Sequence, residues 1–397
     1  MFEEAGRARF RPRPVRSETS GEGSSSKMLK RLYVNNFRCL VAFEMEFDPF
    51  VVLCGPNGAG KSSVFDVIGM LRHLAAGDAV LGSDGPQDIR KLELTEWLDS
   101  KVQEFEIDFM SAGHRLGYKI HIEQVSRELK PRVRFEEATC DGRILYQRDL
   151  DGIQFSKADR TRTGFPLDWR QAALGAIQPA GDRREIELLQ RALSSVAVIR
   201  PSPRVMQPES KGESRSPTPH LENLLSWYRF LSQEQEWTDA LRGNLRDVWP
   251  DFRSFKLEDV GMNSKALQLR FDAPGGAKPA ILQFHQLADG EKALVGLYMI
   301  HAAIDTGALE TVLIDEPDNY VGLPELQPWV LAMRELLDDT HQAILISHHP
   351  EILGNAGRAS GRYLWRDHHG APTRSGPLEI PDGLTAGEAL ARGWVHG

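Results

Sequence analysis

Apolar and polar residues alternate along the chain from Leu29 onward, which is the pattern of half-buried β-strands. The alternation covers residues 29–34 and 43–47. The next run, Phe50 to Cys54, is apolar throughout, which predicts a strand that is buried on both faces. A Gly-rich turn follows, and then apolar residues recur at helical spacing over residues 62–74.

A second set of alternating runs predicts a meander of antiparallel strands. These runs cover residues 105–110, 118–122 and 133–135, and turns at Asp141-Gly142 and Asp151-Gly152 follow them. Asp149 and Asp151 have the spacing of a metal-binding Asp-x-Asp pair. Because Gly152 follows directly, a hairpin turn explains this segment better.

The rest of the chain mixes helical and strand-like patterns. Apolar residues from Leu221 to Leu231 recur at helical spacing and predict an amphipathic helix that continues to Val248. The last third alternates strands with helices, which predicts a parallel sheet that an insertion splits in sequence. The predicted strands are 280–284, 311–314 and 343–346, and the predicted helices are 291–305 and 326–337.

These patterns divide the chain into four parts. Residues 1–27 are rich in Arg, Pro, Ser and Gly and predict a disordered tail, which is either a functional arm or the result of a start codon assigned too early. The first part of the main domain would cover residues 28–125, and its last part would cover 279–397. Residues 126–278 would form an insertion between them.

Composition narrows the class of protein. The 397 residues are 41% hydrophobic and 26% charged, which fits a large globular protein and excludes a disordered one. The net charge is −8, but residues 127–204 carry 15 Lys and Arg against 11 Asp and Glu, so this segment allows a DNA-binding face. The longest apolar run, 293–304, is too short to cross a bilayer, and three widely spaced cysteines fit a reducing, cytoplasmic location with no membrane partner.

A phosphate-binding motif follows the apolar run that ends at Cys54. Gly55-Pro56-Asn57-Gly58-Ala59-Gly60-Lys61-Ser62, here called the phosphate loop, matches G-x-x-x-x-G-K-[ST] between a predicted strand and a predicted helix. Its backbone N–H groups would surround the phosphates, Lys61 would reach the β and γ phosphates, and the Ser62 hydroxyl would bind Mg²⁺. We therefore expect ATP and Mg²⁺ as cofactors, with the adjacent Ser63 at the same site.

Two acidic residues end a later apolar run. Thr311 to Ile314 predicts a strand, and Asp315 and Glu316 follow it. The carboxyl ends of parallel strands face the ligand crevice, so Asp315 can hold Mg²⁺ there. Glu316 can polarise the water that attacks the γ phosphate.

Two further segments complete the set of motifs. Leu287-Ala288-Asp289-Gly290-Glu291-Lys292 precedes a helix whose N-terminal amides attract an anion, and Ile344 to Pro350 places His348 and His349 after an apolar strand. In its order of motifs, the chain resembles the ABC-type ATPases of the SMC, RecF and OLD group. No heptad pattern persists, which excludes a long coiled-coil arm. The Arg-Pro-Ser-Pro within residues 192–204, the pair Asn223-Leu224 and Pro328 also resemble the compact members without a coiled coil that occur in phage-defence operons.

This resemblance implies a fold and a second subunit. The fold would be α/β: an ABC-type ATPase head with a mixed sheet core, an antiparallel β meander and a helical insertion lobe. Ala288, Asp289 and Gly290 would form the signature, which in this group contacts the nucleotide held by a second copy of the chain. Ala288 departs from the family, which usually has a serine that binds the γ phosphate.

The resemblance also implies roles for single residues. His348 would sense the γ phosphate, with His349 as the alternative. Arg38, in the Asn36-Phe37-Arg38 segment, would lie near the nucleotide. Gln103 or Gln87 would link Mg²⁺ to the middle lobe.

The function implied is a switch in which ATP joins two chains and hydrolysis separates them. OLD nucleases carry an acidic nuclease domain after the histidine motif, whereas here no Asp-x-Asp follows His349. We therefore expect a nuclease or another effector to act as a separate partner, in anti-phage defence or DNA repair. The alternatives are the energising subunit of a membrane transporter and a regulatory protein that binds ATP without hydrolysing it.

Overall fold

The computed structural model describes residues 27–82, 92–124, 130–155, 167–178, 183–273, 275, 277–381 and 383–392. The predicted disordered tail lies outside the described residues except for Lys27, which opens the first strand. Gln87 also lies outside them. Among the described helices, none combines the length and apolar character needed to cross a bilayer.

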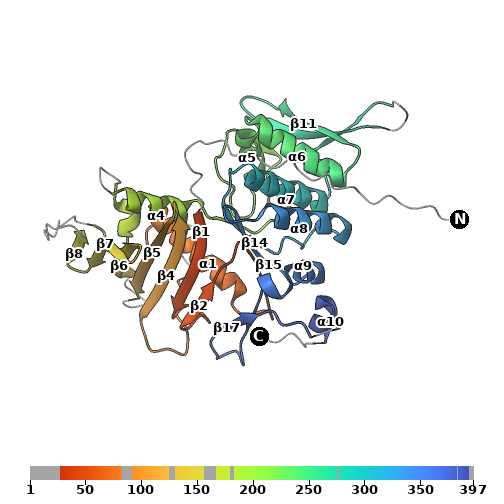
Figure 1. Cartoon of the computed structure of the whole chain (residues 1–397). Helices are drawn as coiled ribbons and strands as arrows, with labels where there is room; N and C mark the ends of the chain where they lie inside the picture. The colour runs from red at the N-terminus through yellow and green to blue at the C-terminus, as the bar shows by residue number, and fades with distance from the viewer. Residues whose placement is uncertain are drawn as a thin grey trace.

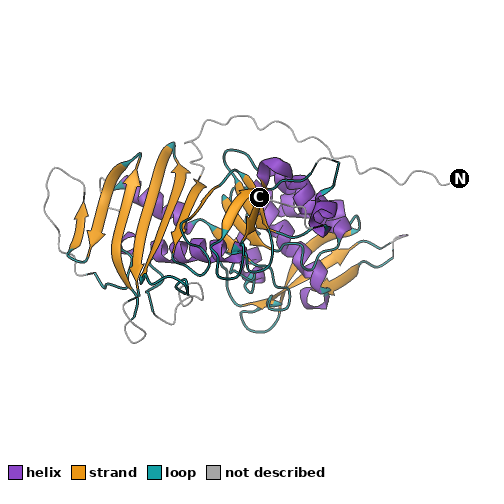
Figure 2. Cartoon of the chain, turned by 90° about the horizontal axis from the view of Figure 1, so that it is seen from below, coloured by secondary structure: helices purple, strands orange, loops and turns teal. Residues whose placement is uncertain are grey.

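The first sheet is the predicted antiparallel meander, and it lies at one end of the molecule (Figures 1 and 2). Its seven strands pair in the order β2-β1-β4-β5-β6-β7-β8. The strands are β1 (Lys27–Asn35), β2 (Phe43–Glu46), β4 (Val102–Ser111), β5 (His114–Glu123), β6 (Arg132–Cys140), β7 (Arg143–Asp149) and β8 (Gly152–Phe155). Asp149 pairs with Gly152 across a tight hairpin, and the Asp151 N–H donates to the Asp149 carboxylate, so the turn predicted there is confirmed.

The second sheet is the predicted parallel core, and it has six strands in the order β17-β16-β3-β15-β14-β9. The five strands from β16 to β9 are parallel, and β17 is antiparallel to β16. They are β3 (Phe50–Cys54), β9 (Ala197–Ile199), β14 (Thr311–Asp315), β15 (Gln342–Ile346), β16 (Gly361–Trp365) and β17 (Arg374–Pro377). Strands 50–54, 311–315 and 342–346 meet in space although they are far apart in sequence.

Helices cover both faces of this parallel sheet, which is why its strands are apolar throughout. Val51 and Leu53 face a core shared with the first sheet, whereas Val52 and Cys54 face a second core on the opposite side. The first core includes residues of α1 (Lys61–Ala76), α3 (Ala173–Ala176) and α4 (Arg184–Ser194). The second includes residues of α5 (Leu224–Leu231), α6 (Gln235–Val248), α7 (Asp289–Asp305), α8 (Leu323–Leu336), α9 (Pro350–Ser360) and α10 (Ala386–Ala391).

The predicted helix from Leu221 to Val248 is wrong as a single helix. It breaks into α5 and α6 at residues 232–234, because no apolar side chain between Leu231 and Trp237 anchors that turn. Trp237 then packs edge-on against Tyr228, with ring centroids 5.6 Å apart. The break lets both helices bury one face in the second core.

A third sheet lies beside α5 and α6, on the side of the molecule away from the first sheet (Figure 1). It consists of β10 (Glu209–Ser210), β11 (Phe252–Asp259), β12 (Lys265–Phe271) and β13 (Ala280–Gln283). A short 3₁₀ turn, η2 (Phe284–Gln286), connects β13 to the start of α7.

Two strand pairings cross the boundaries of the parts into which the sequence pattern divides the chain. β6 pairs with β5 along its length, so residues 132–155 continue the first sheet across the expected boundary at 125/126. β9 pairs with β14, so the expected insertion also contributes a strand to the parallel core. The division into parts stays a prediction.

One buried carboxylate joins the first sheet to α3. Glu136 on β6 is fully buried and accepts hydrogen bonds from the hydroxyls of Tyr118 (2.9 Å) and Tyr146 (2.7 Å). It also accepts the backbone N–H groups of Ala173 (2.6 Å) and Leu174 (2.8 Å) at the start of α3. Burial, together with the Glu136 charge, raises the pKa of both tyrosines well above its usual range, so both remain hydrogen-bond donors.

We predict that Glu136→Gln destabilises the protein by at least about 2 kcal/mol, because an amide cannot accept all four of these buried donors. The matched control is Glu137→Gln, one residue along the same strand on its partly exposed face. That change should cost no more than about 0.5 kcal/mol. Urea unfolding measures both values, and equal losses would contradict the role assigned to Glu136.

Candidate nucleotide-binding site

The site forms where five parallel strands end at one edge of the second sheet. Because β16, β3, β15, β14 and β9 run in the same direction, the residues that follow them meet at this edge. From β16 to β9, the five strands are followed by Arg366, the phosphate loop, His348, the acid pair at 315–316 and Arg200. Three of these groups, including both acidic residues, were expected here from sequence, and the two arginines were not.

The phosphate loop turns sharply between β3 and α1. Gly55 has φ +136°, and a Cβ atom there would lie 1.9 Å from the backbone oxygen of Leu364 on β16. Only glycine allows β16 to approach this closely. The loop therefore follows β3, packs closely against β16 and leads directly into α1. The N–H groups at the start of this helix are available to an anion.

Lys61, the first residue of α1, lies over the phosphate loop. Its ammonium donates to the backbone oxygens of Gly55 (2.8 Å) and Pro56 (3.0 Å). Burial lowers the pKa of Lys61, and the neighbouring Cys54, Glu316 and Asp315 oppose that shift. An arriving phosphate would give the ammonium a charged partner in place of two neutral carbonyl groups.

A cavity of about 590 Å³ opens beside the loop, and its volume suits a nucleotide. Of the residues predicted for the site, it is lined by Arg38, Asn57, Gly58, Gly60, Lys61, Ser62, Ser63, Glu316 and His348. The cavity is not lined by the other three residues of the phosphate loop, which are Gly55, Pro56 and Ala59.

The acid pair lies at the end of β14. Asp315 accepts a hydrogen bond from Ser62; burial raises the pKa of Asp315, while Arg200 and Ser62 partly offset the rise. Glu316 adopts a left-handed conformation with φ +51°, and its N–H donates to the Ile346 oxygen at 2.8 Å. This turn places the Glu316 side chain at the wall of the cavity. A hydroxyl and a carboxylate are ligands that Mg²⁺ prefers, so Ser62 and Asp315 form a suitable donor set.

A chain of ion pairs runs from the cavity wall, where Arg38 and Glu93 lie, to the acid pair. Asp66 on α1 pairs with both Arg38 and Arg200 at 2.5 Å, and Arg200 also contacts the Asp315 carboxylate at 3.2 Å. Arg38 further pairs with Glu93 at 2.9 Å. Arg200 thus connects the helix of the phosphate loop to the expected Mg²⁺ ligand. Sequence reasoning missed this role, because β9 is only three residues long and gives no strand signal.

The two histidines after β15 have different surroundings. His348 lines the cavity, and burial together with the charge of Lys61 lowers its pKa, so the ring is neutral near pH 7. The His349 ring nitrogen Nδ1 instead accepts the Glu351 N–H at 3.2 Å in the first turn of α9. His348 is therefore the one of the two that faces the cavity.

Gln103 does not face the cavity, which corrects the Mg²⁺ role expected for it. Its side chain is fully buried and donates to the backbone oxygens of Asn36 (3.0 Å) and Glu93 (3.2 Å). Its own oxygen accepts the Gln124 amide at 3.2 Å. Gln103 is a glutamine at the start of β4, but these hydrogen-bond partners occupy its side-chain amide. It supports the segment that carries Glu93 to the cavity.

Asn36 holds the other end of that segment. Its side chain donates to the oxygens of Ser100 and Val102, both at 2.9 Å, and accepts the Thr95 N–H at 3.1 Å. Residues 93–97 are thereby held against the cavity, where Glu93, Leu94, Glu96 and Trp97 contribute to its wall. No motif marks these residues in the sequence.

Trp97 and Arg366 lie together at the cavity wall. The Arg366 guanidinium lies 5.5 Å from the centre of the Trp97 ring, and the Trp97 residue is 40% exposed. Arg366 also donates to the Ala371 oxygen at 2.8 Å, which holds its side chain in place. An exposed indole beside a phosphate-binding loop is suited to stack on a purine base.

The segment expected to be the signature lies elsewhere. Ala288 is the N-cap residue of α7, Asp289 and Gly290 are the first two residues of the helix, and none of the three lines the cavity. The Ala288 N–H donates to the Glu291 carboxylate at 2.8 Å, and Asp289 lies 3.6 Å from Arg204. A Cβ on Gly290 would lie 2.7 Å from the Tyr320 backbone oxygen, so a larger residue there would disturb the chain's own packing.

The fold and the converging motifs define an ABC-type P-loop ATP-binding protein with an α/β head like that of SMC proteins. Residues 50–354 match the family described as "AAA domain, putative AbiEii toxin, Type IV TA system". This match covers most of the chain, and the chain belongs to that family.

Comparison with individual proteins agrees with this placement. A 44-residue stretch is 46% identical to the OLD nuclease of Thermus scotoductus (strain ATCC 700910 / SA-01), and it covers 11% of this chain but only 8% of that protein. Among solved structures, an Smc head bound to the C-winged helix domain of ScpA is similar with a TM-score of 0.52 and 14% identity, over 88% of this chain and 98% of that one.

A second solved structure extends the likeness of the fold. The Smc head domain with an extended coiled coil, bound to the C-terminal domain of ScpA from Pyrococcus furiosus, has a TM-score of 0.51 and 12% identity. The alignment covers 92% of this chain and 98% of that one. At this level of identity the likeness concerns the fold alone.

We predict that Trp97→Ala weakens ATP binding by roughly five- to hundredfold, because stacking of a base on an aromatic ring contributes about 1–3 kcal/mol. Fluorescence titration with a labelled ATP analogue measures the affinity. Trp169→Ala is the matched control, since Trp169 is also exposed and also lies beside an arginine, Arg132, but does not line the cavity. Equal affinities for Trp97→Ala and the unmodified protein would exclude a base-stacking role.

Proposed function

We propose that this protein is an ATP-hydrolysing switch in which two chains close around two ATP molecules. One observation carries the proposal: a single chain brings together the phosphate loop, the acid pair and His348, but leaves Ala288 to Gly290 outside the cavity. The resemblance to ABC-type heads assigns this segment to the nucleotide of a second copy. Each active site would then be complete only in a dimer.

Within one site, each side chain has a separate task. The phosphate-loop amides and Lys61 bind the phosphates, and Arg38 lies at the same wall. Ser62 and Asp315 would hold Mg²⁺, which neutralises phosphate charge when bound. Glu316 orients and polarises the attacking water, and the neutral His348 ring donates a hydrogen bond toward the γ phosphate. Asn319 donates to the Glu316 carboxylate at 2.6 Å and holds it in position.

The biological role that we propose is anti-phage defence, with DNA repair as the alternative and a nuclease or another effector as a separate partner. The family description and the short match to an OLD nuclease support defence. Direct DNA contact by residues 127–204 has less support. Arg132, Arg143, Arg170 and Arg191 in that segment each pair with a carboxylate of the same chain.

We predict opposite effects for two substitutions in the cavity. Lys61→Ala should abolish ATP binding and turnover, because Lys61 is the ammonium group at the phosphate loop. Glu316→Gln should keep ATP binding and reduce turnover by at least about a hundredfold, as expected for loss of a general base. Phosphate release and isothermal titration measure the two properties. Turnover by Glu316→Gln at the normal rate would refute the base assignment.

The same pair of variants separates the enzyme from a regulatory binder. If the unmodified protein binds ATP but releases phosphate no faster than Glu316→Gln, the protein holds ATP without hydrolysing it. The replacement of the usual signature serine by Ala288 favours this second candidate function, because a hydroxyl on the γ phosphate is missing.

A further prediction concerns Ala288, which is exposed at the start of α7. Ala288→Ser should tighten ATP-dependent association by up to roughly ten- to hundredfold, since a charge-assisted hydrogen bond contributes about 1.5–3 kcal/mol. Ala288→Arg should block association and turnover but leave ATP binding intact. Sedimentation with ATP and Mg²⁺ measures the association.

Two controls accompany this prediction. Met262→Arg places the same charge on a fully exposed loop residue and should associate normally. Melting temperatures without nucleotide show how much a serine at this position stabilises α7 by itself, since serine is a favourable helix N-cap. If Ala288→Arg associates and turns over ATP like the unmodified protein, α7 does not serve as the signature helix.

A further inference from the structure

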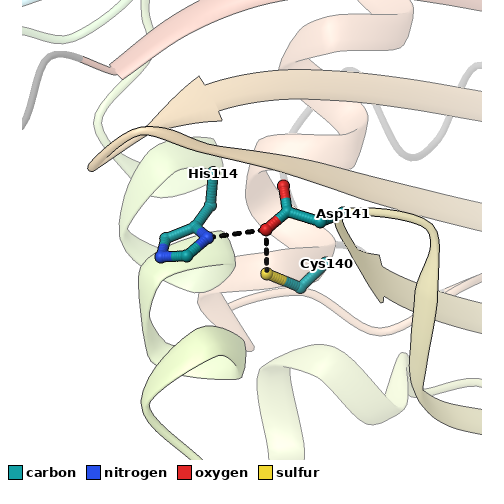
Figure 3. Close-up of side chains that lie close together, drawn as sticks. All are labelled: His114, Cys140 and Asp141. Atoms are coloured by element: carbon teal, nitrogen blue, oxygen red, sulfur yellow. Dashed lines mark hydrogen bonds and ion pairs between the residues drawn. The ribbon is translucent and has the colours of Figure 1, made fainter.

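Three different metal-ligating side chains meet at one end of the first sheet, outside the nucleotide cavity (Figure 3). His114 opens β5, Cys140 ends β6, and Asp141 is the first residue of the turn to β7. Their imidazole, thiol and carboxylate ligand atoms all lie within 4.8 Å of one another. None of the three takes part in the ATP chemistry proposed above.

The backbone holds this cluster in place. β4 and β5 are joined by a tight turn at Ala112-Gly113, and β6 and β7 by one at Asp141-Gly142. β5 and β6 are neighbours, so the two turns lie side by side. Asp141 and Arg115 exchange two hydrogen bonds of 2.8 Å: the Asp141 N–H donates to the Arg115 oxygen, and the Arg115 N–H donates to the Asp141 Oδ1.

The second carboxylate oxygen of Asp141 faces the other two side chains. Its Oδ2 lies 2.7 Å from His114 Nδ1 and 3.8 Å from Cys140 Sγ. Figure 3 shows both contacts converging on this oxygen, with the other ring nitrogen of His114 directed away from the thiol. The arrangement does not fit a thiol nucleophile activated by an imidazole base, because the thiol contacts the carboxylate and not the ring.

The three ligand types and their spacing fit a metal ion instead. Zn²⁺ binds nitrogen, sulfur and oxygen donors at about 2.0–2.3 Å, so three such ligands around one ion lie roughly 3–4 Å apart. The Asp141 carboxylate lies 2.7 and 3.8 Å from the other two ligand atoms, and these two lie within 4.8 Å of each other, so side-chain rotations without a backbone change would reach this geometry. A cavity of about 380 Å³ borders His114 and leaves room there for water as a fourth ligand, whereas Glu185, which also lines this cavity, pairs with Arg143 at 2.9 Å.

We propose that His114, Cys140 and Asp141 form a binding site for Zn²⁺ or a similar divalent transition metal. The ion would join the β4–β5 and β6–β7 hairpins at the end of the first sheet that lies next to α4. The inference is independent of ATP binding, so it stands or fails without the proposed function.

Titration with Co²⁺ of the full chain, freed of metal by chelation, tests the proposal, because a cobalt–thiolate bond gives a charge-transfer band that cobalt on oxygen ligands lacks. We expect the band to saturate at one Co²⁺ per chain, and Zn²⁺ to displace it. Cys140→Ser should abolish the band. His114→Gln and Asp141→Asn should weaken Co²⁺ binding by at least about tenfold, the lower end of what loss of even an outer-shell partner costs a metal site.

Matched controls distinguish this site from others in the chain. His73→Gln removes a second His–Asp pair, His73 with Asp78, and should leave the band unchanged. Asp315→Asn removes the expected Mg²⁺ ligand and should also leave it unchanged. Circular dichroism of each metal-free variant shows whether it folds. The proposal is overturned if the unmodified protein gives no thiolate band, or if folded Cys140→Ser gives the same band as the unmodified protein.

Discussion

Parallel strand pairing is the constraint on which the site depends. β16, β3, β15, β14 and β9 run in one direction, so residues separated by more than 300 positions in sequence meet at one sheet edge. Since both faces of the sheet are packed, with Val52 in one core and Val51 in the other, a shift of one residue would move every side chain of a strand into the opposite core and disrupt its packing. The register of β3 against β15 therefore fixes where the phosphate loop lies relative to His348.

Electrostatics at this edge links ATP binding to the rest of the head. Asp66 pairs with Arg38 and Arg200, and Arg200 reaches Asp315. A few residues farther along the same segment, Arg204 contacts Asp289 at the start of α7. Residues 200–204 thus touch both the expected Mg²⁺ ligand and the expected signature helix. Residues 200–204 therefore connect the charge at Asp315 to the start of α7, the surface that we propose meets a second chain.

Much of this arrangement follows from contiguous sequence patterns. The phosphate loop and the acid pair each combine a strand signal with chemistry inside a few residues, and their strands were predicted to within a few positions. Trp97, Arg366 and Arg200 could not be predicted in the same way, because each contributes through tertiary placement next to a strand end and not through a local motif. The cluster of His114, Cys140 and Asp141 could not be predicted for the same reason, since the register of the β-sheet brings these residues together.

Two errors have specific physical causes. Gln103 has the residue type expected of a Mg²⁺-linking glutamine, but its amide is buried among backbone partners that no pattern of single residues reveals. The helix predicted from Leu221 to Val248 is interrupted because helical spacing on either side of a polar turn does not establish that the turn itself is helical.

The central claim is that ATP joins two chains through α7. Light scattering on Glu316→Gln, which should bind ATP without consuming it, tests this claim most directly. With ATP and Mg²⁺ the account predicts a mass of twice the 44.5 kDa chain, and without nucleotide a smaller species. A mass of one chain in the presence of saturating, demonstrably bound ATP would contradict it.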